Sequence, residues 1–105
     1  MQTNHLSHFL LTNLLREKLS AAGNARVINV SSMLAKRGKI TLDNINYESD
    51  SSNAALKTTY ANSKLMNIMF SQEIGRRWKH LGITAFSCHP GFVRFSIFVF
   101  LRLLS

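Results

Sequence analysis

Tyr60 and Lys64 are the pair in this sequence whose types and spacing most directly indicate acid–base chemistry. Residues four apart on a helix share one face and lie a turn from each other. A free tyrosine has a pKa of about 10, and a nearby ammonium lowers it by favouring the phenolate, which makes proton transfer near neutral pH more efficient. A Tyr and a Lys also fall one turn apart by chance, as a solvent-facing pair with a packed ring. The spacing alone therefore does not identify a site.

Three further motifs accompany this pair in a fixed order along the chain. Segment 4–12 (NHLSHFLLT) begins an apolar stretch of helical spacing. Segment 27–32 (VINVSS) is a β-branched run that ends in two serines, and segment 89–93 (HPGFV) follows a second such run. In sheets of parallel strands, ligands bind beyond the carboxyl ends of the strands. We therefore expect the polar residues 31–32 and 88–91 to face one crevice.

With segment 60–64 (YANSK), these motifs resemble the active-site pattern of the short-chain dehydrogenases/reductases. That pattern is a Tyr-x-x-x-Lys helix, preceded by a strand ending in Ser-Ser and followed by a strand ending in Pro-Gly. Segment 4–12 is similar to the helix that bears the family's active-site asparagine. The four motifs cover essentially the whole chain. Segments 4–12, 38–40 (GKI) and 63–67 (SKLMN), with the long interval before Tyr60, resemble the retinol dehydrogenase-like branch.

The resemblance implies an oxidoreductase that moves hydride between NAD or NADP and the carbon of an alcohol or carbonyl, such as retinol or retinal. Tyr60 would be the general acid–base at the substrate oxygen, and Lys64 would lower its pKa and hydrogen-bond the nicotinamide ribose. Ser32 would hydrogen-bond the substrate oxygen and stabilise developing charge, with Ser31 as the alternative. Asn4 would hold a water in a proton relay through Lys64. The hydride chemistry belongs to the cofactor.

The cofactor side of the pattern is less complete. The resemblance implies that the nicotinamide contacts Tyr60, Lys64, Pro90, Gly91 and Val93, the last through its backbone. The family usually has a threonine shortly after Pro-Gly. Phe95 stands there instead, and Ser96 could substitute only if the loop shifts. The five glycines are isolated and form no phosphate-binding fingerprint.

We therefore expect residues 1–105 to be the C-terminal portion of one such domain, lacking its N-terminal dinucleotide-binding half. Little or no activity is expected from this chain alone, because positioning supplies much of an enzyme's rate. The residues that discriminate NAD from NADP belong to the first βαβ unit of such domains, so the cofactor stays open between the two.

Hydrophobic periodicity predicts the elements that position these residues. Apolar residues at helical spacing predict helices over 3–19 and 54–80, the first stopped around Gly23 and the second at Gly82. Segments 26–31 and 83–87 are expected to be strands, the first similar to a parallel strand covered on both faces. Residues 33–53 are expected to form a long, mostly irregular connection. The order predicts an α/β fold, part of a Rossmann-type doubly wound parallel sheet.

Composition excludes several classes of protein. The chain is 46% hydrophobic and carries 13 Lys and Arg against 5 Asp and Glu, a net charge of +8. The basic residues are scattered without interleaved aromatics or a nucleic-acid-binding motif, so no nucleic-acid partner is predicted. Cys88 is the only cysteine, which favours a reducing compartment: the cytoplasm or the cytoplasmic face of an intracellular membrane. His5 and His8 lack a third ligand at suitable spacing, so no metal site is predicted.

Two functions of another class stay open. A non-catalytic remnant would act through association, including a homo-oligomer, because an unpaired sheet edge and uncovered apolar faces favour pairing with another chain. A peripheral membrane protein would use the basic surface and the apolar stretch 92–104. Arg94 and Arg102 interrupt that stretch, and it is too short to span a bilayer.

Overall fold

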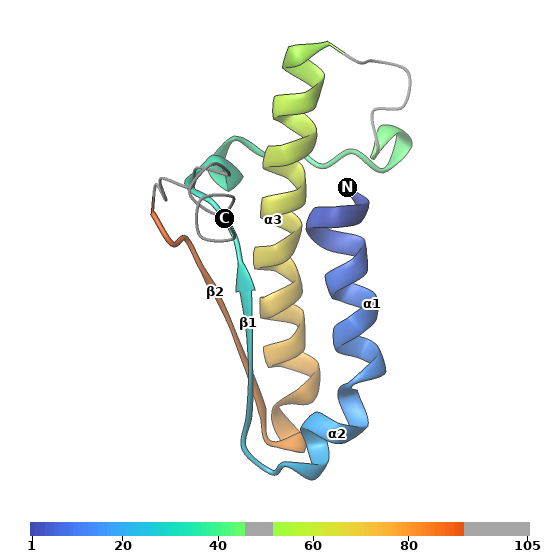
Figure 1. Cartoon of the computed structure of the whole chain (residues 1–105), viewed down its shortest axis with the longest axis vertical. Coiled ribbons are helices and arrows are strands. Elements are labelled where there is room, and N and C mark those ends of the chain that lie inside the picture. The colour runs from blue at the N-terminus through green and yellow to red at the C-terminus, as the bar shows by residue number, and fades with distance from the viewer. Residues whose placement is uncertain (46–51, 92–105) are drawn as a thin grey trace, which may run out of the picture.

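The computed structural model describes residues 1–45 and 52–91, and its elements follow the order expected from the sequence. They are a π-helical turn Gln2–Leu6, α1 (Ser7–Leu14), α2 (Arg16–Ala21), β1 (Ala25–Val30), 3-10 turns Met33–Arg37 and Leu42–Asn44, α3 (Asn53–Trp78), a 3-10 turn Lys79–Leu81 and β2 (Ile83–Cys88) (Figure 1). The apolar stretch 92–104, which a peripheral membrane protein would use, lies outside the described residues.

The two strands form a parallel pair joined through α3. Their register runs from Ala25 opposite Ile83 to Val30 opposite Cys88. The long helix α3 packs on both strands, and α1 runs beside α3. This arrangement confirms the predicted α/β class, because parallel neighbours require a crossover element between them.

Only one face of the sheet is covered in the described part of the chain. Alternate residues of β1 point toward α3, and among them Ala25 and Asn29 are buried. On the opposite face Ile28 is 61% exposed and Phe86, its partner in the register, is 54% exposed. The expectation that β1 is covered on both faces is therefore wrong for these residues, because no described helix lies against the second face.

The hydrophobic core lies at the end of the molecule where α3 meets the starts of the strands. Its buried members are Ala25, Phe70, Ile74, Trp78 and Ile83. Phe9 of α1 joins it through a ring contact with Phe70, with centroids 4.9 Å apart. Most other apolar side chains of α1 stay exposed, including Leu10 and Leu14. The helical spacing predicted there is correct, but no side chain of α1 is fully buried, and Phe9 itself is 45% exposed.

The connection between α3 and β2 turns at Gly82, as predicted. Gly82 has φ +73°, the left-handed conformation that glycine adopts without a steric penalty. A Cβ at this position would overlap the carbonyl oxygen of Gly23, which itself has φ +74°. The Gly82 carbonyl also accepts the Ala25 amide at 3.1 Å, so the two turns brace the starts of both strands.

Gly82→Ala should destabilise the fold by about 1–3 kcal/mol, because the new methyl group meets backbone and φ is strained. Gly75→Ala is the matched control: its Cβ would meet nothing within 4 Å in the interior of α3, so it should stabilise by about 0.5–1 kcal/mol. Urea unfolding followed by the fluorescence of Trp78, the single tryptophan, measures both. Equal effects of the two substitutions would contradict this account of the turn.

Candidate active site

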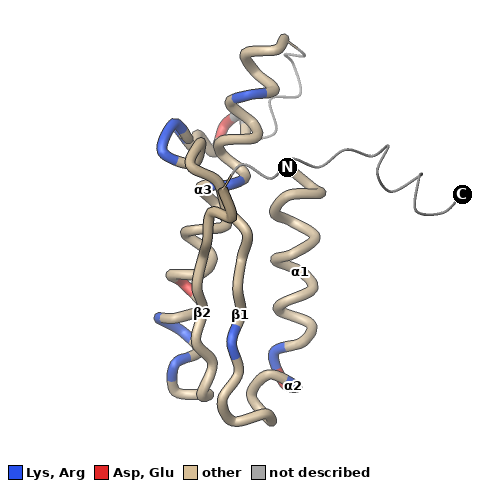
Figure 2. The backbone as a smooth tube through the Cα atoms, turned by 60° about the vertical axis from the view of Figure 1, so that its left-hand side comes forward, with Lys and Arg blue, Asp and Glu red and all other residues tan. Residues whose placement is uncertain are grey.

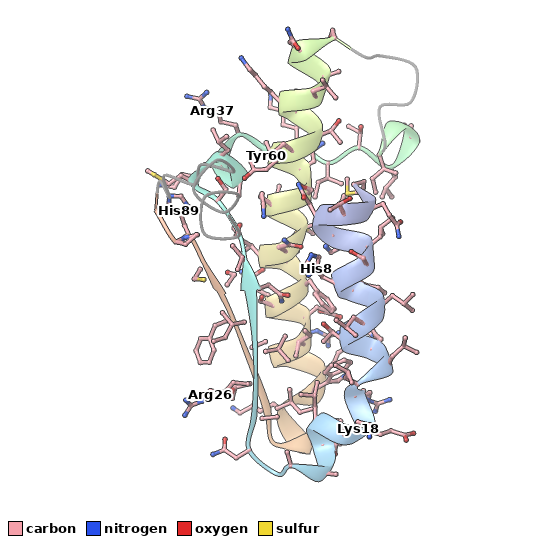
Figure 3. The ribbon with its side chains drawn as sticks, in the orientation of Figure 1. His8, Lys18, Arg26, Arg37, Tyr60 and His89 are labelled. Carbon is pink, nitrogen blue, oxygen red and sulfur yellow. The ribbon has the colours of Figure 1, made fainter. Side chains whose placement is uncertain are left out.

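A cleft of about 700 Å³ opens beyond the carboxyl ends of β1 and β2. It is lined by Val30, Ser31, Ser32, Met33, Leu34, Lys36, Arg37, Tyr60, Lys64, His89, Pro90 and Gly91. Figure 3 shows Tyr60, His89 and Arg37 gathered at this end of the molecule. One crevice is thus lined by Ser31, Ser32 and residues 89–91, as their sequence positions predicted, whereas Cys88 ends β2 and is not part of this lining.

Tyr60 and Lys64 reach this cleft from the middle of α3. The Lys64 Nζ lies 5.7 Å from the centre of the Tyr60 ring, and Tyr60 is 39% exposed. The same Nζ donates a hydrogen bond to the carbonyl oxygen of Val30 at 3.2 Å. Because that carbonyl ends β1, the ammonium is held over the strand end. The pair is therefore part of the cleft and not an unconnected solvent-facing pair.

The two serines after β1 make different contacts. Ser31 is buried, and its Oγ donates to the backbone carbonyl of Lys64 at 2.7 Å. Ser32 caps the turn Met33–Arg37, where its Oγ accepts the Leu34 amide at 3.2 Å. A hydroxyl that accepts a bond still has a proton to donate. Ser31 is thus occupied in tying strand to helix, whereas the Ser32 hydroxyl has its donor available on the cleft side.

Asn4 lies behind the cleft and touches it only through α3. Its Nδ2 donates to Ser63 Oγ at 3.1 Å, and Ser63 in turn donates to the Tyr60 carbonyl at 2.7 Å. The turn that carries Asn4 is π-helical, a rare form that recurs near functional sites. The backbone carbonyl of Asn4 accepts a hydrogen bond from Asn67 Nδ2 at 3.0 Å, a side-chain donor from another helix.

Asn67 is a structural centre of this region whose role sequence reasoning missed. Besides the Asn4 carbonyl, its Nδ2 donates to the Val30 carbonyl at 3.1 Å, and its Oδ1 lies 2.9 Å from His5 Nδ1. One amide thus joins the first helical turn, α3 and the end of β1. A sequence signal existed, because an asparagine among apolar residues on a helix face implies buried partners. His5 belongs to this network, and the structure gives it a hydrogen-bonding role.

The loop after Ser32 is fixed against α3 by two close contacts. The amide of Lys39 donates to Asn62 Oδ1 at 2.7 Å, and Asn62 is fully buried. A Cβ on Gly38 would come within 2.9 Å of Leu65 Cδ2. The backbone of this loop therefore approaches α3 as closely as a glycine permits, which holds the residues between Ser32 and Gly38 over the cleft.

Pro90 and Gly91 line the cleft as predicted, whereas Val93, Phe95 and Ser96 lie outside the described residues.

At the far end of α3, hydrogen bonds from Arg76 and Arg77 lower the pKa of Glu73 to about 2. That carboxylate lies more than two helical turns beyond Lys64 on α3 and lines a different pocket, not the cleft. It supplies no acid–base group to the site.

Comparison with known proteins shows which family this sequence resembles. No family model matches the chain. Human retinol dehydrogenase 11 is 48% identical over 91 residues, and human retinol dehydrogenase 13 is 43% identical over 91 residues, in each case across 87% of this chain. The chain belongs to the short-chain dehydrogenase/reductase family, in its retinol dehydrogenase-like branch. It spans about 28% of the length of the first relative and 27% of the second.

A solved structure supports the same fold. A crystal structure of an uncharacterized protein from Mycobacterium paratuberculosis superposes with a TM-score of 0.73 at 37% sequence identity. The match covers 90% of this chain and 34% of that chain. The partial Rossmann-type α/β fold expected from the sequence is thus confirmed.

Asn67→Ala should cost about 2–3 kcal/mol of stability, because His5 and the Asn4 carbonyl lose their partner in a buried setting. The control is Asn13→Ala on α1, where an exposed amide donates to the Phe9 carbonyl within its own helix. That change should stay within about 0.5 kcal/mol. Urea unfolding followed by Trp78 fluorescence compares the two. A similar small cost for both would show that Asn67 is not the centre of the network.

Proposed function

We propose that this chain carries the proton-transfer half of an NAD(P)-dependent oxidoreductase acting on an alcohol or carbonyl substrate. The observation that carries the proposal is that Tyr60, Lys64 and Ser32 line one cleft at the carboxyl ends of parallel strands. The relatives are named retinol dehydrogenases, so retinol, retinal or another lipophilic alcohol or carbonyl is the substrate class to test. The apolar side chains of Met33 and Leu34 in the same cleft suit such a substrate.

Tyr60 is the group proposed to exchange a proton with the substrate oxygen. Lys64 lies beside it in the cleft, with its Nζ 5.7 Å from the centre of the Tyr60 ring. The Ser32 hydroxyl would donate a hydrogen bond to the same oxygen as charge develops on it. Because Ser31 already donates to the Lys64 carbonyl, the geometry favours Ser32 for this part.

Asn4, which lies outside the cleft lining, is proposed to support a proton relay that runs through Lys64. A carbonyl oxygen has two lone pairs, and the bond from Asn67 uses one of them. The second lone pair of the Asn4 carbonyl would hold a water that passes protons toward Lys64. The bonds from Asn67 and to Ser63 would then serve to fix this carbonyl in place.

A bound nicotinamide nucleotide would supply or accept the hydride. The residues that would hold its nicotinamide ring and ribose are Tyr60, Lys64, Pro90, Gly91 and Val93. Gly91 lines the cleft with φ +85°, a left-handed conformation that glycine adopts without a steric penalty. The sequence has no glycine-rich turn to cradle the phosphates, so this chain would be the C-terminal portion of a complete cofactor-binding domain.

A role in association is the second candidate, and the uncovered sheet face favours it. Ile28, Val30 and Phe86 are each more than half exposed on one side of the strand pair. Apolar surface of this kind marks contacts with another chain or a membrane surface. Among the described residues, no helix has both the length and the apolar character needed to cross a membrane.

The decisive test is a titration of the purified, folded chain with NADPH and NADH, followed by nucleotide fluorescence. We expect weak binding, with a Kd on the order of 0.1–1 mM, because much of the contact surface for the cofactor is not in the chain. Lys64→Ala should weaken it several-fold, whereas the exposed Lys18→Ala on α2 should not. Tyr60→Phe should retain binding and abolish any residual reduction of retinal.

The outcomes separate the two candidates. Absence of nucleotide binding in a chain shown to be folded by circular dichroism would favour the association role. Equal losses in Lys64→Ala and Lys18→Ala would show that the nucleotide is held by net charge alone. Tight micromolar binding would contradict the expectation that this chain by itself has little activity.

A further inference from the structure

A second, smaller pocket adjoins the cleft on the side of the loop that follows Ser32. It has a volume of about 300 Å³ and is lined by Leu34, Arg37, Lys57, Thr58 and Ala61. Leu34 and Arg37 line both this pocket and the cleft, so the two are contiguous. Lys57 lies one turn before Tyr60 on α3, at the i, i+3 spacing that places two side chains on neighbouring parts of one helix face.

The lining of these two pockets carries positive charge without a described counterion. Lys36, Arg37 and Lys64 line the cleft, and Arg37 and Lys57 line the smaller pocket. No Asp or Glu contributes to either lining in the described ranges. Within the described ranges, the ion pairs are those of Arg76 and Arg77 with Glu73. They lie nearer the other end of α3. Figure 2 shows basic positions grouped near one end of α3 and again near its other end.

The chemistry of the smaller pocket favours an anion that is attached to an apolar body. A guanidinium presents paired N–H donors that match a carboxylate or phosphate, and an ammonium adds a point charge. Leu34 and Ala61 add apolar side chains to the same lining. A ligand that extends from this pocket along Leu34 would enter the cleft that Tyr60 lines.

We infer that Arg37 and Lys57 hold the carboxylate or phosphate of a ligand whose apolar body extends into the Tyr60 cleft. The inference deepens the proposed function, because it takes the reacting end of the ligand to lie at Tyr60. It assigns the substrate class as amphiphilic: an apolar alcohol or carbonyl compound that also bears an anionic group. The cofactor's own phosphates are the alternative source of that anion, and the experiment separates them.

The probes are 11-(dansylamino)undecanoate and its uncharged primary amide, titrated against the folded chain at low ionic strength by dansyl fluorescence. We expect the carboxylate to bind about fivefold more tightly than the amide, the size expected for two partly exposed ion pairs. Arg37→Gln/Lys57→Gln should erase this preference. Raising the salt to 0.5 M should reduce it in the unaltered chain, because exposed charges are screened.

The matched control is Lys18→Gln/Arg26→Gln, which removes the same charge from the opposite end of the molecule (Figure 3). It should leave the preference for the carboxylate intact. Equal binding of the two probes, a preference that survives Arg37→Gln/Lys57→Gln, or equal loss in both double variants would each overturn the inference. The last result would show that only net charge attracts the probe.

An NADH titration of the same variants distinguishes this inference from the proposed function. Arg37→Gln/Lys57→Gln should bind NADH as tightly as Lys18→Gln/Arg26→Gln, which removes the same charge, because the pocket is assigned to substrate. Weaker NADH binding in this variant alone would assign the pocket to the cofactor and would overturn the inference. Absence of NADH binding with the carboxylate preference intact would contradict the proposed function and leave the anion pocket supported.

Discussion

The carbonyl oxygen of Val30, the last residue of β1, accepts hydrogen bonds from two side chains of α3. Lys64 Nζ reaches it at 3.2 Å and Asn67 Nδ2 at 3.1 Å. The next residue, Ser31, donates its hydroxyl to the Lys64 carbonyl and its amide to the Cys88 carbonyl of β2. The end of β1 is thereby fixed to the helix on one side and to the neighbouring strand on another. The placement of Tyr60, Ser32 and the loop after it all depends on this junction.

The two ends of α3 are held by different forces. Near the starts of the strands, Phe70, Ile74 and Trp78 pack into the hydrophobic core. Toward the cleft, its buried side chains are largely polar, and Asn62, Ser63, Asn67 and Ser71 are joined to four other segments of the chain. Apolar packing tolerates small shifts, whereas hydrogen bonds require defined distances and angles. The cleft end is therefore the part of α3 whose position is specified most closely, which acid–base chemistry requires.

Local sequence signals predicted the elements and much of the site. The spacing of Tyr60 and Lys64 and the serines and Pro-Gly at the strand ends were enough to place these groups in one cleft, because both follow from short-range rules of helices and parallel strands. Contacts between distant residues were not predicted. Asn67 bonds to His5 across 62 positions, and no periodicity in the sequence encodes that pairing. The open face of β1 was missed for a related reason, since β-branched residues such as Ile28 indicate a covering layer without showing whether the chain supplies it.

Contacts made by the uncovered sheet face need not change the hydrogen bonds that arrange the cleft. Ile28, Val30 and Phe86 point away from α3, whereas every hydrogen bond described at the cleft runs between β1, β2, α3 and the segments packed on the same side. Exposed apolar surface lowers solubility and promotes association, but it does not remove the bonds that orient Lys64 over the strand end. Tyr60 and Ser32 can thus keep their mutual placement whatever covers the other face. The proposed association through that face and the proposed proton transfer in the cleft are therefore compatible, since the face runs along the strands and the cleft lies beyond their carboxyl ends, with Val30 at the boundary of both.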